Sequence, residues 1–152
     1  PHNPGGRVWT REELQKVAAI CERNKVIVVA DEIHADLTFA PYTHIPYATI
    51  SEEAKMHSVV FASASKAFNM AGFASSYAVI SNPTLRRRFN SYVEGNELAA
   101  GNVFAFNTTV AAYNEGETWL SEMLDYVQEN IQFLTNYIAE HLPMLKVIVP
   151  QV

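Results

Sequence analysis

The chain has 152 residues, 49% of them hydrophobic and 18% charged, and a formal net charge of −5 at pH 7. These values fit one globular domain. The negative charge argues against nucleic acid as a partner, because phosphate binding needs clustered lysines and arginines. The apolar runs are far shorter than the ~20 residues that cross a bilayer, and a single cysteine fits a reducing compartment. We therefore expect a cytoplasmic protein without a membrane or nucleic acid partner.

The first part of the chain predicts a turn, a helix and a strand. Residues 2–6 combine two glycines with a proline and form the turn. Thr10 and Glu13 have the spacing of a capping box, and an apolar stripe after them predicts a helix that ends near Asn24. The β-branched run over residues 25–30 predicts a strand buried on both faces, as in parallel sheets flanked by helices.

The rest of the chain continues the alternation of strands and helices. A short acidic helix is expected from Ser51, and apolar runs predict strands over residues 58–62 and 77–80. Asn82 and the proline after it begin a further helix. Such alternation indicates an α/β fold, here a three-layer sandwich in which helices flank a mostly parallel sheet.

A long helix is predicted near the end of the chain. Apolar residues spaced by three and four run from about Thr118 to His141, and Pro143 stops the pattern. The apolar residues 147–149 then predict one more strand. Because the chain begins inside a turn and ends just after this run, we expect it to be part of a longer protein.

Two charged residues follow predicted strands. Asp31 comes directly after residues 25–30, and Lys66 comes shortly after residues 58–62. In open α/β sheets, ligands bind outside the carboxyl ends of the strands. If these strands are neighbours, at ~4.8 Å per strand, both side chains face one site. The pattern predicts a ligand site at this edge without naming the ligand.

Three polar motifs occur in a fixed order around these strands. They are Asn3-Pro4-Gly5-Gly6, Asp31-Glu32-Ile33-His34 and Ser63-Ala64-Ser65-Lys66. Singly, they are typical of a turn, a helix cap and a surface lysine. Together they resemble the fold-type I pyridoxal-phosphate (PLP) enzymes of the class I/II aminotransferase group. The resemblance rests on motifs from His2 to about Phe73, and on layout alone beyond that point.

The resemblance implies a role for each polar residue. Lys66 is the lysine that binds PLP as an imine and later moves the α-proton of the substrate. Asp31 pairs with the pyridine nitrogen and keeps it protonated. Asn3 donates to the ring oxygen of the cofactor. Ser63 contacts the phosphate and Ser65 assists it.

Two positions depart from the family pattern. His34 stands where many members carry a tyrosine directed at the ring oxygen, so it is either a substitute donor or a structural histidine. Ala74 stands where many members carry a phosphate-binding arginine. The phosphate must then be held by other groups.

The resemblance also implies how the whole protein is organised. Residues 1–117 would belong to the PLP-binding large domain, residues 118–142 to a connecting helix and residues 143–152 to the start of a small C-terminal domain. The family's phosphate loop and carboxylate-binding arginine lie outside these segments. We therefore expect the 152 residues alone to be inactive and to bind PLP weakly.

The full-length protein is expected to be a homodimer with sites at the subunit interface. Residues 96–107, with Phe104 and Phe106, either contribute to that interface or pack into the core.

Residues 1–9, 31–37 and 65–72 resemble the C–S β-lyase (cystathionine β-lyase) branch of the group. This implies β-elimination from cystathionine-like or cysteine-S-conjugate amino acids, giving pyruvate, ammonia and a thiol. Transamination of amino acids is the alternative, because Lys66 serves either reaction.

Parts of the sequence also fit other classes of protein. Residues 27–34 have the form of a DExH helicase motif, but no phosphate-binding P-loop is visible. A non-catalytic regulatory protein that keeps the PLP fold is a further alternative. The histidines lack the tight spacing of a metal site, so no metal is expected.

Overall fold

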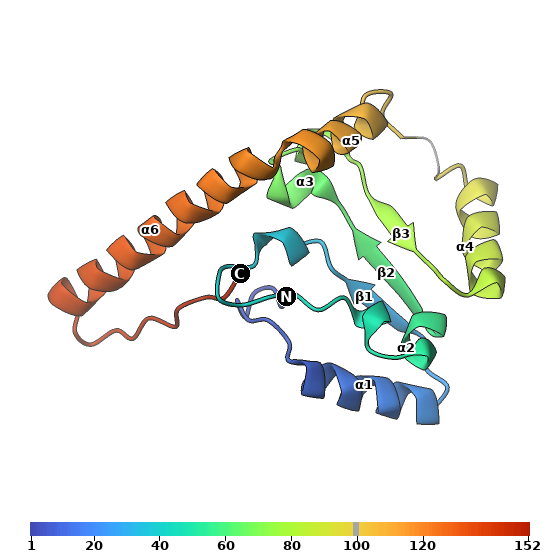
Figure 1. Ribbon diagram of the computed structural model, residues 1–152, viewed down its shortest axis with the longest axis horizontal. Coiled ribbons are helices and arrows are strands. Elements are labelled where there is room, and N and C mark those ends of the chain that lie inside the picture. The colour runs from blue at the N-terminus through green and yellow to red at the C-terminus, as the bar shows by residue number, and fades with distance from the viewer. Residues whose placement is uncertain (99–100) are drawn as a thin grey trace.

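The fold is described from a computed structural model that covers residues 1–98 and 101–152. Three strands form its sheet in the order β1 (Val28–Asp31), β2 (Ser58–Ala62) and β3 (Tyr77–Val79) (Figure 1). β1 and β2 are parallel, with Asp31 opposite Phe61. All three strands were predicted from the sequence, and the α/β class is confirmed.

The sheet is mixed, because β3 runs antiparallel to β2 with Tyr77 opposite Ala62. Only two short helical segments connect these strands, α3 (Ala64–Ala67) and η3 (Ala71–Phe73). A parallel crossover needs a connection that returns along the whole sheet, usually a longer helix. Here the chain re-enters the sheet at the edge where β2 ends, and the prediction of mostly parallel pairing holds for one of the two pairs.

One face of the sheet carries the core. Helix α1 (Arg11–Arg23), the short segment η2 (Tyr47–Thr49) and helix α2 (Glu52–Met56) supply its buried side chains. Their buried residues pack with the inward side chains of β1, and together they comprise Ala18, Tyr47, Ala54, Leu14, Val17, Val28, Ala30 and Ile50. The predicted capping box begins α1: Thr10 Oγ1 accepts from the Glu13 N–H at 3.2 Å, and Glu13 Oε2 accepts from the Thr10 N–H at 2.9 Å.

The opposite face is less covered than predicted. Helix α4 (Pro83–Gly95) contacts it through Phe89, whose ring centroid lies 6.0 Å from that of Phe61. Val29 is 65% exposed, so the prediction of a strand buried on both faces is wrong for β1. This strand also begins three residues later than predicted. Lys25 adopts a φ of 55°, and the Val26 N–H donates to Cys21 at the end of α1, which delays the extended run.

Two helices follow α4 at the carboxyl edge of the sheet. α5 (Ala105–Glu115) was not predicted, whereas α6 (Glu117–His141) matches its prediction within one residue. α6 projects away from the sheet (Figure 1), and the chain after it returns toward the N-terminus. In the part of the chain that the structure describes, every helix is too short or too polar to span a bilayer.

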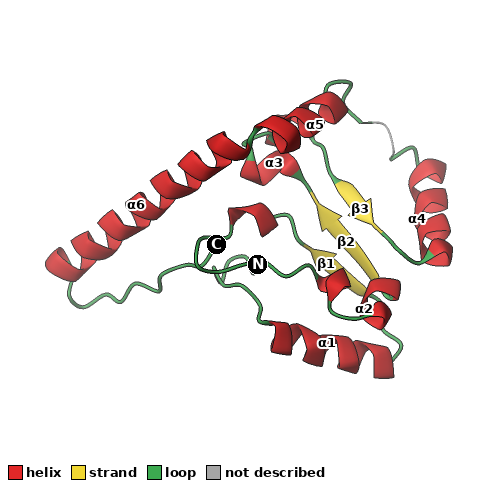
Figure 2. Ribbon diagram, in the orientation of Figure 1, coloured by secondary structure: helices red, strands yellow, loops and turns green. Residues whose placement is uncertain are grey.

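The predicted strand over residues 147–149 is not formed. Figure 2 shows a loop after α6, and Ile148 is 84% exposed. A strand needs a partner for its backbone groups, and none of the described residues supplies one there. The ordered contacts begin at Pro150 and Gln151, which lie against the N-terminal turn around Gly6.

We expect Gly6→Ala to destabilise the protein by about 1–2 kcal/mol. Gly6 has a φ of 60°, and an added Cβ would lie 3.0 Å from Cβ of Pro150. Urea unfolding of the full-length protein measures the change. Gly72→Ala is the matched control, because a Cβ added at Gly72 would meet no atom within 4 Å and Gly72 has no positive φ. Equal effects of the two substitutions would contradict the expectation.

Candidate functional site

Asp31 is the last residue of β1, as the sequence predicted. Its Oδ1 atom accepts a hydrogen bond from the Ile33 N–H at 3.2 Å, and the residue is exposed. This bond turns the backbone away from the sheet while the carboxylate stays accessible to a ligand.

Lys66 lies in α3, directly after β2, and is exposed. The start of α3 is fixed by Ser63, whose Oγ accepts from the Ser65 N–H at 3.0 Å and donates to the carbonyl of Ser75. α3 lies against the short segment η1 (Ala35–Leu37), which follows His34. The structure therefore brings the lysine-bearing helix beside the loop that follows Asp31.

The Ser63 side chain is buried, at 3% exposure, and its hydroxyl proton is used within the chain. A hydroxyl has one proton to donate. A phosphate would have to compete with the Ser75 carbonyl for it. The phosphate contacts of Ser63 and Ser65 remain predictions.

Asn3 and His34 line one pocket of about 260 Å³, together with Leu37 and Val152. The turn that carries Asn3 is closed by two backbone bonds: the His2 N–H donates to Arg7 at 2.9 Å and the Gly6 N–H donates to His2 at 2.8 Å. These two sequence-predicted residues therefore come together although 31 positions separate them in the chain.

Asp31 lines a second pocket of about 320 Å³, together with Trp9, Glu32 and His44. Pro1 lines both pockets, so the two adjoin. Lys66 lines neither of them. The predicted residues thus surround one edge of the sheet rather than one enclosed cavity.

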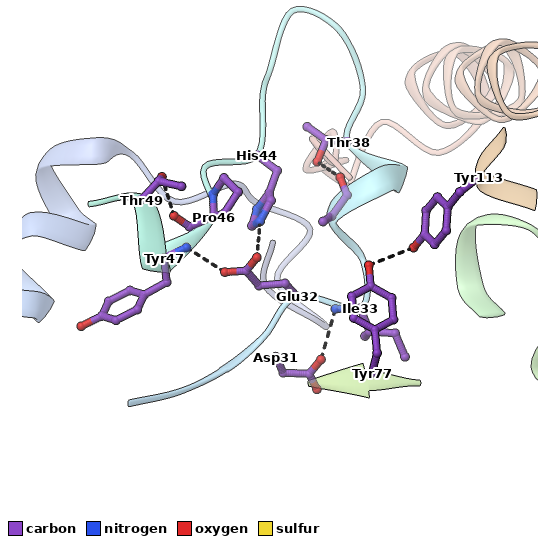
Figure 3. A network of polar contacts seen from close by, with 11 residues as sticks. Asp31, Glu32, Ile33, Thr38, His44, Pro46, Tyr47, Thr49, Tyr77 and Tyr113 are labelled. Carbon is purple, nitrogen blue, oxygen red and sulfur yellow. Dashed lines mark hydrogen bonds and ion pairs between the residues drawn. The ribbon is translucent and has the colours of Figure 1, made fainter. Parts of the chain in front are cut away.

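Glu32 belongs to one of the polar motifs in the sequence, but the resemblance assigned it no role. Its Oε2 lies 2.9 Å from His44 Nε2, and its Oε1 accepts from the Tyr47 N–H at 2.8 Å (Figure 3). Because a carboxylate only accepts, Nε2 of His44 carries the shared proton. The side chains of Glu32 and His44 are 11% and 15% exposed. Glu32 therefore fastens the loop before η2 to the strand end that bears Asp31.

A second polar contact joins three elements near this edge. Tyr113 of α5 donates to Asp36 Oδ2 at 3.3 Å. Its hydroxyl also lies 3.4 Å from that of Tyr77 in β3, and Figure 3 shows this second contact. Burial raises the pKa of Tyr113 well above its usual range, and the hydrogen bond with Tyr77 and the charge of Asp36 raise it further. Tyr113 therefore stays protonated and donates to Asp36.

No group of three or more histidine, cysteine, aspartate or glutamate side chains is arranged to hold a metal ion among the residues that the structure describes.

The fold and the edge of the sheet agree with one protein family. Residues 1–151 match the family described as aminotransferase class I and II, and the chain belongs to this family. It is a family of enzymes that use PLP. Membership rules out the helicase interpretation of residues 27–34.

Individual relatives include both lyases and aminotransferases. The chain is 37% identical over 150 residues to cystathionine β-lyase PatB of Bacillus subtilis, covering 99% of the chain and 39% of that protein. It is 30% identical over 153 residues to an aspartate aminotransferase of Bacillus sp. strain YM-2, covering 99% of the chain and 38% of that protein.

Among solved structures, the PLP-bound C–S lyase from Staphylococcus hominis superposes with a TM-score of 0.90 at 34% identity, covering 99% of the chain and 37% of that protein. The chain thus spans between a third and two fifths of the length of the proteins that it matches.

We expect Glu32→Ala to lower the free energy of unfolding by about 2–4 kcal/mol, because it leaves His44 Nε2 and the Tyr47 N–H without their buried acceptor. Urea unfolding of the full-length protein measures this. Glu52→Ala is the control, since the pair of Glu52 with Lys55 is exposed and contributes little. A loss for Glu32→Ala no larger than that for the control would contradict the expectation.

Proposed function

We propose that the protein containing this chain is a PLP-dependent C–S β-lyase that acts on cystathionine-like or cysteine-S-conjugate amino acids. The observation that carries the proposal is the position of Asp31 and Lys66. Asp31 ends β1, and Lys66 follows the end of the parallel neighbour β2. The similarity to PatB and to the Staphylococcus hominis lyase favours elimination as the reaction.

The residues at this edge fit the cofactor chemically. Asp31 offers an exposed carboxylate and Lys66 an exposed amine, which are the two charged groups that PLP requires. Asn3 and His34 add polar side chains around the adjoining pocket. We propose that these four residues hold the cofactor, with Ser63 and Ser65 on the side of its phosphate.

When bound, PLP supplies a ring that withdraws electrons from the α-carbon of an amino acid. Asp31 would hold a proton on the ring nitrogen and thereby keep the ring electron-poor. The Lys66 amine removes the proton from the substrate α-carbon as a general base. Asn3 and His34 orient the ring through its oxygen.

Elimination and transamination diverge after this proton transfer. In elimination, a thiolate leaves from the β-carbon, and hydrolysis gives pyruvate and ammonia. In transamination, the proton would be returned away from the α-carbon, hydrolysis would release a keto acid, and the amino group would be kept for transfer to a second keto acid. The similarity to an aspartate aminotransferase supports the second candidate, and Lys66 moves a proton in both.

We further propose a homodimer in the full-length protein. Val103, Phe104 and Phe106 are 86%, 67% and 75% exposed at the start of α5, which supports an interface rather than core packing. Residues 99–100 of the predicted segment 96–107 lie outside the described residues. We also propose that α6 connects a large domain (residues 1–117) to a small one that begins at residue 143. The single thiol, Cys21, supports a cytoplasmic location.

The full-length protein is expected to release pyruvate from cystathionine faster than it transfers amino groups between an amino acid and a keto acid. Lys66→Ala should lower the elimination rate by roughly 10²- to 10⁴-fold or more, because it removes the general base. Lys55→Ala, on the exposed side of α2, is the control and should keep the rate. Steady-state assays of pyruvate and of keto acid measure both reactions.

Amino transfer without pyruvate release would establish the aminotransferase instead. Binding of PLP without either reaction would favour the regulatory protein. Full elimination activity in Lys66→Ala would contradict the role of Lys66.

A further inference from the structure

Gln151 joins three segments that lie far apart in the sequence. Its backbone N–H donates to the Gly6 carbonyl at 2.6 Å, and its carbonyl accepts from the Phe39 N–H at 2.9 Å. Its side-chain Oε1 accepts from the Val8 N–H at 2.8 Å. Val8 and Phe39 are both buried. Gln151 therefore pairs with backbone groups of two separate segments, the one at Gly6 and Val8 and the one at Phe39.

The turn that carries Asn3 is held by these contacts. Backbone bonds from His2 to Arg7 and from Gly6 to His2 close the turn, so Asn3 moves together with Gly6. Pro150 packs directly against Gly6, close enough to leave no ordinary room for a side chain there. Residues 150 and 151 thus restrain the turn from one side.

The next residue, Val152, contributes to the pocket that Asn3 lines. Val152 lines the pocket that contains Asn3 and His34, and Leu37 of η1 lines it too. Because Gln151 also bonds to Phe39, two residues beyond η1, it lies between the Asn3 turn and the segment that follows Asp31.

We propose that Gln151 is a positioning residue for the cofactor site. It fixes the Asn3 turn relative to the His34–Leu37 segment, and so sets where the Asn3 amide meets the ring oxygen of PLP. This inference rests on the proposed function. It also links the segment after α6 to the cofactor: docking of this segment raises the affinity for PLP, and PLP in turn favours the docked segment by the same factor.

The side chain of Gln151 acts through its oxygen. Glutamate keeps an oxygen acceptor within reach of the Val8 N–H, whereas methionine keeps the volume and replaces the oxygen with a much weaker acceptor. Neither substitution alters the two backbone bonds of residue 151. The pair Gln151→Glu and Gln151→Met therefore isolates the bond to Val8.

The experiment uses the full-length protein with PLP. We expect Gln151→Met to weaken PLP binding by roughly threefold to tenfold, because a buried N–H loses its partner in the docked state. It should also shift the pH midpoint of the visible absorbance of bound PLP in the direction that Asn3→Ala shifts it. Gln151→Glu should keep the PLP affinity within about twofold of the wild type and leave the pH midpoint unshifted, because it retains an oxygen acceptor. Gln132→Met on α6 is the control, because Gln132 is exposed and bonds only to Asn136 among the described residues.

A double variant separates positioning from general stability. If Gln151 acts through Asn3, Gln151→Met adds nothing to Asn3→Ala in PLP affinity or in the pH midpoint. Independent, multiplying effects would overturn the inference, as would a Gln151→Met protein that binds PLP like the wild type. Gln151→Asn has a side chain too short to reach Val8, so it should weaken PLP binding as Gln151→Met does.

Failure of the inference is distinguishable from failure of the proposed function. A normal absorbance band of lysine-bound PLP in Lys66→Ala would overturn the proposed function. An unchanged affinity and pH midpoint in Asn3→Ala would overturn the role of Asn3 and the inference with it. An altered Asn3→Ala beside an unaltered Gln151→Met would overturn the inference alone.

Discussion

Parallel pairing of β1 with β2 is the constraint on which the rest of the site depends. It places the ends of both strands at one edge of the sheet, so that Asp31 and the helix bearing Lys66 emerge side by side. A slip of one residue in this register would turn Asp31 to the other face. The core formed by Tyr47, Ala18 and Ala54 against β1 opposes such a slip, because Val28 and Ala30 must face it.

Polar contacts then hold the loops that leave this edge. Glu32 binds the loop that contains His44, Tyr113 binds Asp36, and Gln151 binds the turn that carries Asn3. Each contact joins segments that are distant in the chain, and each lies next to a residue proposed to hold the cofactor. The charged groups that would meet PLP stay exposed, while the pair of Glu32 with His44 and the partners of Gln151, Val8 and Phe39, are mostly buried. Such support keeps a site rigid before a ligand arrives.

Sequence reasoning predicted the features that depend on neighbouring residues. The capping box of Thr10 and Glu13, the start of α4 at Asn82 and the length of α6 follow from local hydrogen bonding and periodicity. Features set by distant contacts were missed or wrong. The antiparallel direction of β3, the partner of Glu32 and the docking of Gln151 depend on which segments meet in space, and the apolar run at residues 147–149 lacks the neighbour that would make it a strand.

We propose that Lys66 holds PLP covalently in the full-length protein. Borohydride reduction of the PLP-bound protein fixes the cofactor to the lysine that holds it, and peptide mass spectrometry then locates the modified residue. The expected result is a phosphopyridoxyl group on the peptide that contains Lys66. A phosphopyridoxyl group on another lysine, such as Lys25 or Lys55, would contradict the claim.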